Sequence, residues 1–215
     1  MKNPFRARWP LLLAGCVLGS AMNAAAAGMA YRKLVQTALP AELPLEGQFV
    51  AAVAWTDATG DNYAVLTDSR ELRRGRPVSS ALRAVGYRVT SGVPQPVWRV
   101  KDGIEDCDLD MTSFFEATSL EVTDLDRNGV GEVSFVYRLA CNGGVDLIEE
   151  KLFLVEDGRK YPIRGGTEPR GAVVNDRFER FDGPMKVDKA YDSAPPAFKS
   201  FAIAKWRRFR RPTGW

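Results

Sequence analysis

Alternating apolar and polar residues fill most of the chain between residues 47 and 165. Alternation with a period of two puts every second side chain on the same face, which is typical of strands buried on one side. Turn residues separate the alternating segments, so neighbouring strands are predicted to pair as antiparallel hairpins. The predicted strands are GQFVAAVAWTD, NYAVLTDS, LRAVGYRVT, VWRV, SLEVTDL, EVSFVYRLAC, KLFLVED and KYPIRG.

Three other segments favour helix. Residues 29–38 place Tyr31, Leu34 and Val35 at helical intervals before two prolines, which predicts a short N-terminal helix. Residues 110–119 are expected to form one or two helical turns. After Ser193 as a cap, the apolar residues up to Phe209 follow helical spacing, which predicts an amphipathic C-terminal helix. The predicted fold class is therefore α+β, mainly an antiparallel meander of hairpins.

The first 27 residues resemble an export signal, because three basic residues precede a short apolar run and a small-residue end, NAAAAG. The run of about 14 residues is shorter than the roughly 20 that a membrane-spanning helix needs. Residues 28–215 are then expected to form a single exported, periplasmic domain without a transmembrane span. Leu-Ala-Gly-Cys at residues 13–16 leaves an alternative open, in which Cys16 is acylated and anchors an outer-membrane lipoprotein.

Charge argues against nucleic acid as a partner. Three of the 30 basic residues and none of the 27 acidic residues lie in the predicted signal, so the remainder has no net charge. The last 11 residues are strongly basic. Their cations are Lys205, Arg207, Arg208, Arg210 and Arg211. Cations stabilise a helix C-terminus, and they also suit contact with an anionic glycan or lipid surface.

Cys107 and Cys141 are an even pair once Cys16 is set aside. In an oxidising compartment they are expected to form a disulfide, while two buried free thiols are the alternative.

The chain has no histidine, which removes Ser-His-Asp and Cys-His catalysis. An enzyme built from these residues would have to use carboxylates, as a hydrolase of envelope polysaccharide does with two acids. The candidates Glu116, Glu121, Glu149 and Glu150 are more simply interpreted as solvated surface charges.

The segment DLDRNGVGE, residues 124–132, places oxygen donors at alternate positions around a glycine. This pattern suits a hard cation, and Ca²⁺ fits better than Mg²⁺, which keeps more of its water. The predicted ligands are the side chains of Asp124, Asp126, Asn128 and Glu132 and the carbonyl of Val130.

The loop is not an EF-hand, because its twelfth position is Phe135 and its flanks alternate as strands. It resembles instead the strand-loop-strand calcium loops of integrin-type propeller repeats. The alternative is a hairpin turn on Asn128-Gly129, although a turn has no use for three carboxylates. The upstream segment WTDATGDNYAVL echoes the loop but lacks alternating donors, so no metal is predicted there.

Several motifs together resemble an uncharacterised family of exported bacterial proteins that often carry the label "surface polysaccharide biosynthesis protein". They are WTDATGDNYAVL, AVGYRV, VWRVKDGIEDCDLD, SLEVTDLDRNGVGEVSFVYRLAC and KLFLVEDGRKYPIRG, within residues 50–167. The resemblance implies a periplasmic domain with Cys107 paired to Cys141 and an acidic loop at 124–132, but no mechanism. The chain departs from the family at Gly86, where a His is common, and at Asn142-Gly143-Gly144.

Together these patterns predict an exported cell-envelope protein that binds Ca²⁺ and acts as a structural or glycan- or lipid-binding module. A carboxylate-dependent hydrolase is the alternative. The sequence leaves the oligomeric state open.

Overall fold

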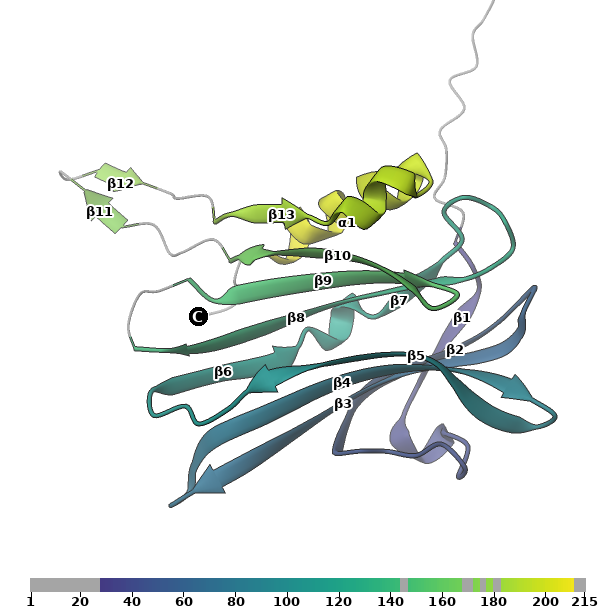
Figure 1. Cartoon of the computed structure of the whole chain (residues 1–215), viewed down its shortest axis with the longest axis horizontal. Helices are drawn as coiled ribbons and strands as arrows, with labels where there is room; N and C mark the ends of the chain where they lie inside the picture. The colour runs from purple at the N-terminus through teal and green to yellow at the C-terminus, as the bar shows by residue number, and fades with distance from the viewer. Residues whose placement is uncertain (1–27, 144–146, 168–171, 175–176, 180–182, 211–215) are drawn as a thin grey trace, which may run out of the picture.

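Two antiparallel sheets account for most of the protein in a computed structural model, which describes residues 28–143, 147–167, 172–174, 177–179 and 183–210 (Figure 1). The first sheet has the order β1 (Tyr31–Leu34), β2 (Gln48–Asp57), β3 (Gly60–Arg73), β4 (Arg76–Thr90) and β5 (Val93–Ile104). The second has the order β13 (Met185–Val187), β10 (Arg159–Gly166), β9 (Glu149–Glu156), β8 (Glu132–Asn142) and β6 (Asp110–Phe115), with β7 (Glu121–Thr123) also paired to β8. β11 (Ala172–Val174) pairs with β12 (Arg177–Glu179). These strands confirm a mainly β fold of the α+β class.

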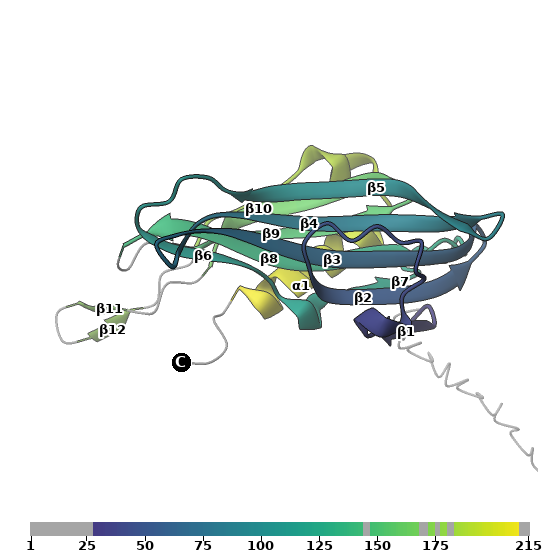
Figure 2. The same cartoon turned by 90° about the horizontal axis from the view of Figure 1, so that it is seen from below.

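The main core lies between the two sheets, which face each other (Figure 2). Val53, Leu66 and Trp98 enter it from the first sheet, and Phe135 and Phe153 enter it from the second. Rings from β8 and β9 stack on one another, with the centroids of Phe135 and Phe153 5.7 Å apart. Alternation along each strand therefore buries one face of each sheet, as the sequence predicts.

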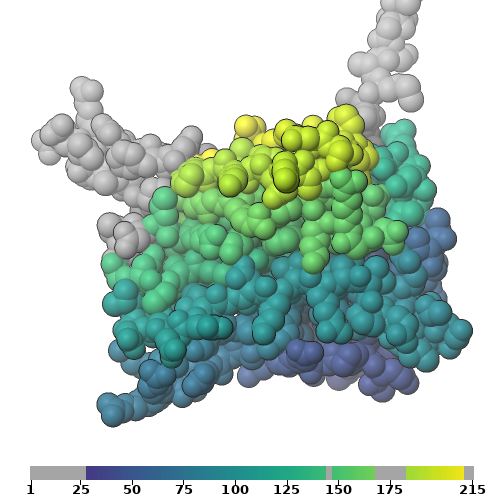
Figure 3. Space-filling model, viewed as in Figure 1, coloured from purple at the N-terminus to yellow at the C-terminus, as the bar shows by residue number. Residues whose placement is uncertain are grey.

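The outer faces of both sheets are also covered. Helix α1 (Pro196–Phe209) lies on the second sheet, where Phe198 and Trp206 pack against Leu152 and Leu154 of β9. This explains why β9 is almost continuously apolar, since both of its faces are buried. The segment before β2 covers the first sheet, and Figure 3 shows the N-terminal and C-terminal segments on opposite sides of the molecule.

Tight turns fix the register of the hairpins. Arg74-Gly75, Ser91-Gly92 and Asp157-Gly158 each have positive φ at both positions and join consecutive antiparallel strands. Such turns match the twist of the paired strands, and glycine adopts positive φ without a steric penalty. The predicted hairpin around Asp157-Gly158 is confirmed.

The predicted N-terminal helix is wrong. Tyr31–Leu34 forms β1, which pairs with β2, and only a 3-10 turn, η1 (Gln36–Ala38), follows it. So few residues before Pro40 cannot repay the cost of starting a helix, whereas the edge of β2 offers hydrogen-bond partners at once. Tyr31 and Leu34 then pack on opposite faces of the first sheet.

The helical turns predicted for residues 110–119 are wrong over their first half. Residues 110–115 form β6 on the edge of β8, and a 3-10 turn, η2 (Ala117–Ser119), follows. Aromatic and β-branched residues favour strand here, and Phe115 is buried whereas Phe114 faces outward. The disulfide Cys107–Cys141 is present and holds the start of this segment beside β8, which confirms the predicted pairing.

The C-terminal helix is confirmed, but its predicted cap is not. Pro195 occupies the cap position without a side-chain hydrogen bond, and Ser193 ends the 3-10 turn η3 (Lys189–Ser193) and accepts a hydrogen bond from Arg159. No helix in the described part of the chain is long and apolar enough to span a membrane. The predicted signal, with Cys16, lies outside the described residues.

Candidate metal site

The acidic loop joins β7 to β8 and begins and ends on a strand pair. Thr123 of β7 lies opposite Glu132 of β8, so the two ends of the loop are held side by side. Arg127 and Gly129 have positive φ and turn the chain between them. The strands thus fix both ends of a short loop.

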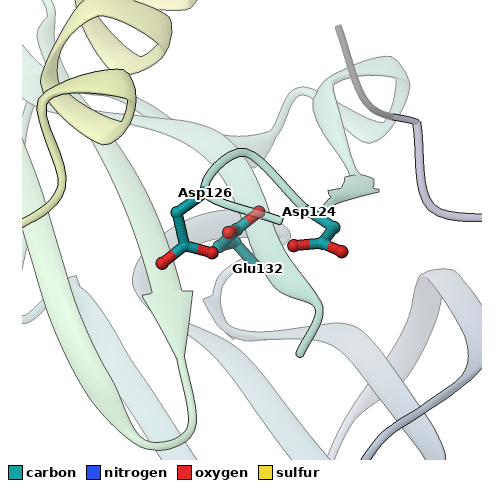
Figure 4. Close-up of side chains that lie close together, drawn as sticks. All are labelled: Asp124, Asp126 and Glu132. Carbon is teal, nitrogen blue, oxygen red and sulfur yellow. The ribbon is translucent and has the colours of Figure 1, made fainter. Parts of the chain in front are cut away.

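Three carboxylates meet in this loop. Oxygen atoms of Asp124, Asp126 and Glu132 all lie within 4.8 Å of one another (Figure 4). In Figure 4 the carboxylates of the two aspartates approach Glu132 from either side. Each side chain offers hard oxygen ligands, so the arrangement can hold a divalent cation.

Glu132 is the most buried of the three, with none of its surface exposed. Its carboxylate accepts a hydrogen bond from the Thr123 hydroxyl at 2.8 Å and from the Leu125 N–H at 3.0 Å. Burial raises the pKa of Glu132 to about 7 despite these donors, and the negative charges of Glu156 and Asp126 act in the same direction. A carboxylate in such surroundings is ionised at neutral pH only at a cost, which a bound cation would remove.

Asp124 and Asp126 are less buried. Asp124 Oδ2 accepts a hydrogen bond from the Gly129 N–H at 3.2 Å, but its Oδ1 is buried and has no hydrogen-bond donor among the described residues. Asp126 Oδ1 accepts the Asn128 N–H at 3.2 Å. A buried carboxylate oxygen without a donor is costly unless something else binds it.

Of the other two predicted ligands, the Asn128 side chain is hydrogen-bonded to the loop and to β9, and Val130 contributes its N–H to Asn128. Asn128 Oδ1 accepts the Val130 N–H at 2.7 Å, and its amide donates to Asp126 and, at 2.8 Å, to Glu156 Oε1. The structure therefore brings three of the five predicted ligands together, while the Asn128 side chain orders the loop and links it to β9.

Two further residues lie at the site that the sequence did not predict there. Glu156 ends β9 opposite Glu132, and burial together with the charges of Asp126, Asp157 and Asp124 raises its pKa. Asp57 ends β2 in the upstream echo of the loop. The shared Thr-Asp of the two segments was the only signal for Asp57, and the strand register was needed to place Glu156.

Asp57 ties the acidic loop to the first sheet. Its Oδ2 accepts the Gly131 N–H at 2.9 Å and the Trp55 indole N–H at 2.7 Å, and its Oδ1 accepts three further donors, two from Thr59 and one from Asn62. The neighbouring Ala58 N–H donates to the Gly129 carbonyl at 2.8 Å. Burial acts to raise the pKa of Asp57, but the hydrogen bonds from Thr59, Gly131 and Trp55 outweigh it and lower that pKa. Asp57 thus bridges the two sheets beside the carboxylates.

The four candidate catalytic acids are each bound to a cation. Glu116 and Glu150 both contact the Arg138 guanidinium, at 2.8 and 3.0 Å. Glu121 contacts Lys205 at 2.6 Å, and Glu149 contacts Lys151 at 3.2 Å. The interpretation of all four as solvated charges is wrong, because Glu150 is fully buried on the outer face of the second sheet.

Lys205 does not belong to the predicted basic surface, which is a second correction. Its side chain is buried, and its ammonium donates to Glu121 and to the Ser119 carbonyl and Ser134 hydroxyl. Burial lowers the pKa of Lys205 to about 8, although Glu121 acts against the shift. Arg207 and Arg208 are exposed, Arg210 is partly buried, and Arg211 lies outside the described residues. Lys205 therefore anchors α1 to the sheet.

No protein-family model, curated protein or solved structure matches the chain. The resemblance to an exported family of cell-envelope proteins therefore remains a prediction.

Proposed function

We propose that this chain is an exported cell-envelope protein that binds Ca²⁺ through the loop at residues 124–132 and acts as a structural or glycan- or lipid-binding module. The observation that carries the proposal is the group of three carboxylates at Asp124, Asp126 and Glu132. Glu132 is fully buried, and Asp124 Oδ1 has no hydrogen-bond donor among the described residues. A hairpin turn alone gives no reason to gather two aspartates around a buried glutamate.

The donor set favours Ca²⁺ over transition metals. All three carboxylates supply hard oxygen atoms, and neither histidine nor free cysteine lies in the loop. Asp126 is partly exposed, which leaves room for the water molecules that complete a calcium shell.

A cation at this position would stiffen the junction between the sheets. The loop contacts the β2–β3 turn through Asp57 and Ala58, and it contacts β9 through Asn128 and Glu156. Neutralising the carboxylates would lower the repulsion that opens this junction. The proposed role of the metal is therefore structural, and the exposed Arg207 and Arg208 support contact with an anionic glycan or lipid.

A thermal melt with the disulfide intact tests the metal site. We expect 1 mM Ca²⁺ to raise the melting temperature by a few degrees relative to EDTA, because a dissociation constant of about 0.1 mM corresponds to about 1.4 kcal/mol of stabilisation. Asp126→Ala should lose the shift. Asp110→Ala, which removes an exposed carboxylate on β6, is the matched control and should keep it.

Equal melting temperatures in EDTA and Ca²⁺ for the unsubstituted protein would reduce the loop to an acidic turn. An equal shift with Mg²⁺ would contradict the choice of Ca²⁺.

A further inference from the structure

A cavity of about 110 Å³ lies on the outer face of the first sheet, the face that points away from the second sheet. Residues 44–46, from the segment before β2, form its roof. The roof is tied to the sheet, because the Pro44 carbonyl accepts the Tyr87 hydroxyl at 3.2 Å and the Glu46 carbonyl accepts the Thr67 hydroxyl at 2.7 Å. The cavity is therefore part of the folded structure, lying between the sheet and this segment and open to solvent at Glu46, Arg99 and Lys101.

The strand register sorts the floor of the cavity into an apolar and a basic part. Val65 of β3 lies beside Val85 of β4, which lies beside Arg99 of β5. The next row on the same face contains Thr67, Arg83 and Lys101 in the same order. Apolar side chains thus line the centre of the sheet, and cations line its β5 edge.

Two of the three cations are available to a ligand. Glu46 is the acid that lines the cavity, and it already pairs with Arg83 at 3.2 Å. Arg99 and Lys101 are exposed, and among the described residues neither forms an ion pair. A positive edge beside an apolar cavity is complementary to a molecule with an apolar body and an anionic end.

We propose that this cavity binds a small amphiphilic anion, with a short alkyl or aromatic group between Leu45, Val65 and Val85 and a carboxylate or phosphate at Arg99 and Lys101. The volume limits the apolar group. A cavity of roughly 150 Å³ holds the six carbons of benzene, so one of about 110 Å³ suits about four buried carbons, with the carbons next to the headgroup outside it. The site is separate from the calcium loop and does not depend on it.

Titration with matched six-carbon probes, followed by NMR of the methyl groups of Leu45, Val65 and Val85, tests the proposal. Hexanoate should shift these methyl signals, 1-hexanol should bind more weakly, and hexylammonium should not bind. Comparing hexyl phosphate with hexanoate shows whether the site prefers a phosphate or a carboxylate headgroup.

Variants separate the contribution of charge from that of shape. Arg99→Gln with Lys101→Gln should weaken hexanoate about tenfold, since each exposed ion pair contributes up to about fivefold, and should leave 1-hexanol unchanged. Arg32→Gln with Lys33→Gln removes an exposed basic pair from β1 and should change neither.

The proposal would be overturned by the absence of any shift of these methyl signals at 10 mM of any probe, by hexanol binding as tightly as hexanoate, or by unchanged hexanoate binding in the Arg99→Gln and Lys101→Gln variant. Binding to vesicles of anionic lipid without binding of the soluble anions would also overturn it.

Discussion

Calcium binding should release a proton from Glu132 at mildly acidic pH. The pKa of this buried carboxyl is raised from 4.5 to about 7, so at pH 6 about nine-tenths of the molecules carry the proton. Coordination requires the ionised carboxylate. The expected release is therefore about one proton for each Ca²⁺ at pH 6 and about 0.1 at pH 8, from the raised pKa.

The same pKa fixes how affinity and stability change with pH. The Ca²⁺ affinity should fall about tenfold from pH 8 to pH 6 and about tenfold again to pH 5. The stability of the Ca²⁺-free protein should change with pH in the opposite direction to the Ca²⁺ affinity. Because the pKa of Glu132 is higher in the folded protein, its contribution to stability is present below pH 4.5 and lost as the pH rises through 7, a total of about 3 kcal/mol.

Calorimetric titration at pH 6 in two buffers of different ionisation enthalpy measures the released protons directly. Glu132→Gln keeps an acceptor for Thr123 and Leu125 but cannot ionise, so it should neither bind Ca²⁺ nor show this pH dependence. Glu150→Gln is the control, because burial raises the pKa of Glu150 to about 7 as well, although it pairs with Arg138 and is not among the loop carboxylates. Binding at pH 6 without proton release would show that Glu132 is not a ligand.

Three further predictions concern residues around the site and the core. Asp57→Asn should weaken Ca²⁺ binding about tenfold by calorimetry, because an amide cannot accept hydrogen bonds from all the donors that contact the Asp57 carboxylate. An unchanged affinity would show that the loop keeps its shape without these hydrogen bonds. Lys205→Met should lower the free energy of unfolding in urea by about 1 to 3 kcal/mol, since it removes the donor that the partly exposed Glu121 carboxylate and the buried Ser119 and Ser134 oxygens share. Gly86→Ala should cost about 1 to 3 kcal/mol in the same assay, because its Cβ would lie 2.1 Å from Trp98, whereas Gly143→Ala meets nothing within 4 Å and should be neutral.

Local patterns predicted the parts of the fold that local interactions decide. The turn at Asp157-Gly158 and the apolar face of α1 follow from a few adjacent residues, and both were predicted. Tyr31–Leu34 was predicted wrongly, because its conformation depends on pairing with β2, about twenty residues later along the chain.

The candidate site divides in the same way. Asp124, Asp126 and Glu132 could be recognised from their spacing within nine residues. Asp57 reaches the same loop from 74 residues away, and Lys205 meets Glu121 across 84 residues. Contacts at such separations are set by how the sheets and the helix pack, which no local pattern reveals.

The position of α1 as the cover of the second sheet has a consequence for the order of folding. The helix follows every strand in the sequence, so Leu152 and Leu154 of β9 are synthesised before the residues that shield them. During that interval the nascent sheet presents an apolar face to its surroundings, and such a transiently exposed face is prone to aggregation. The outer face of the first sheet has no such delay, because the segment that covers it is made before β2.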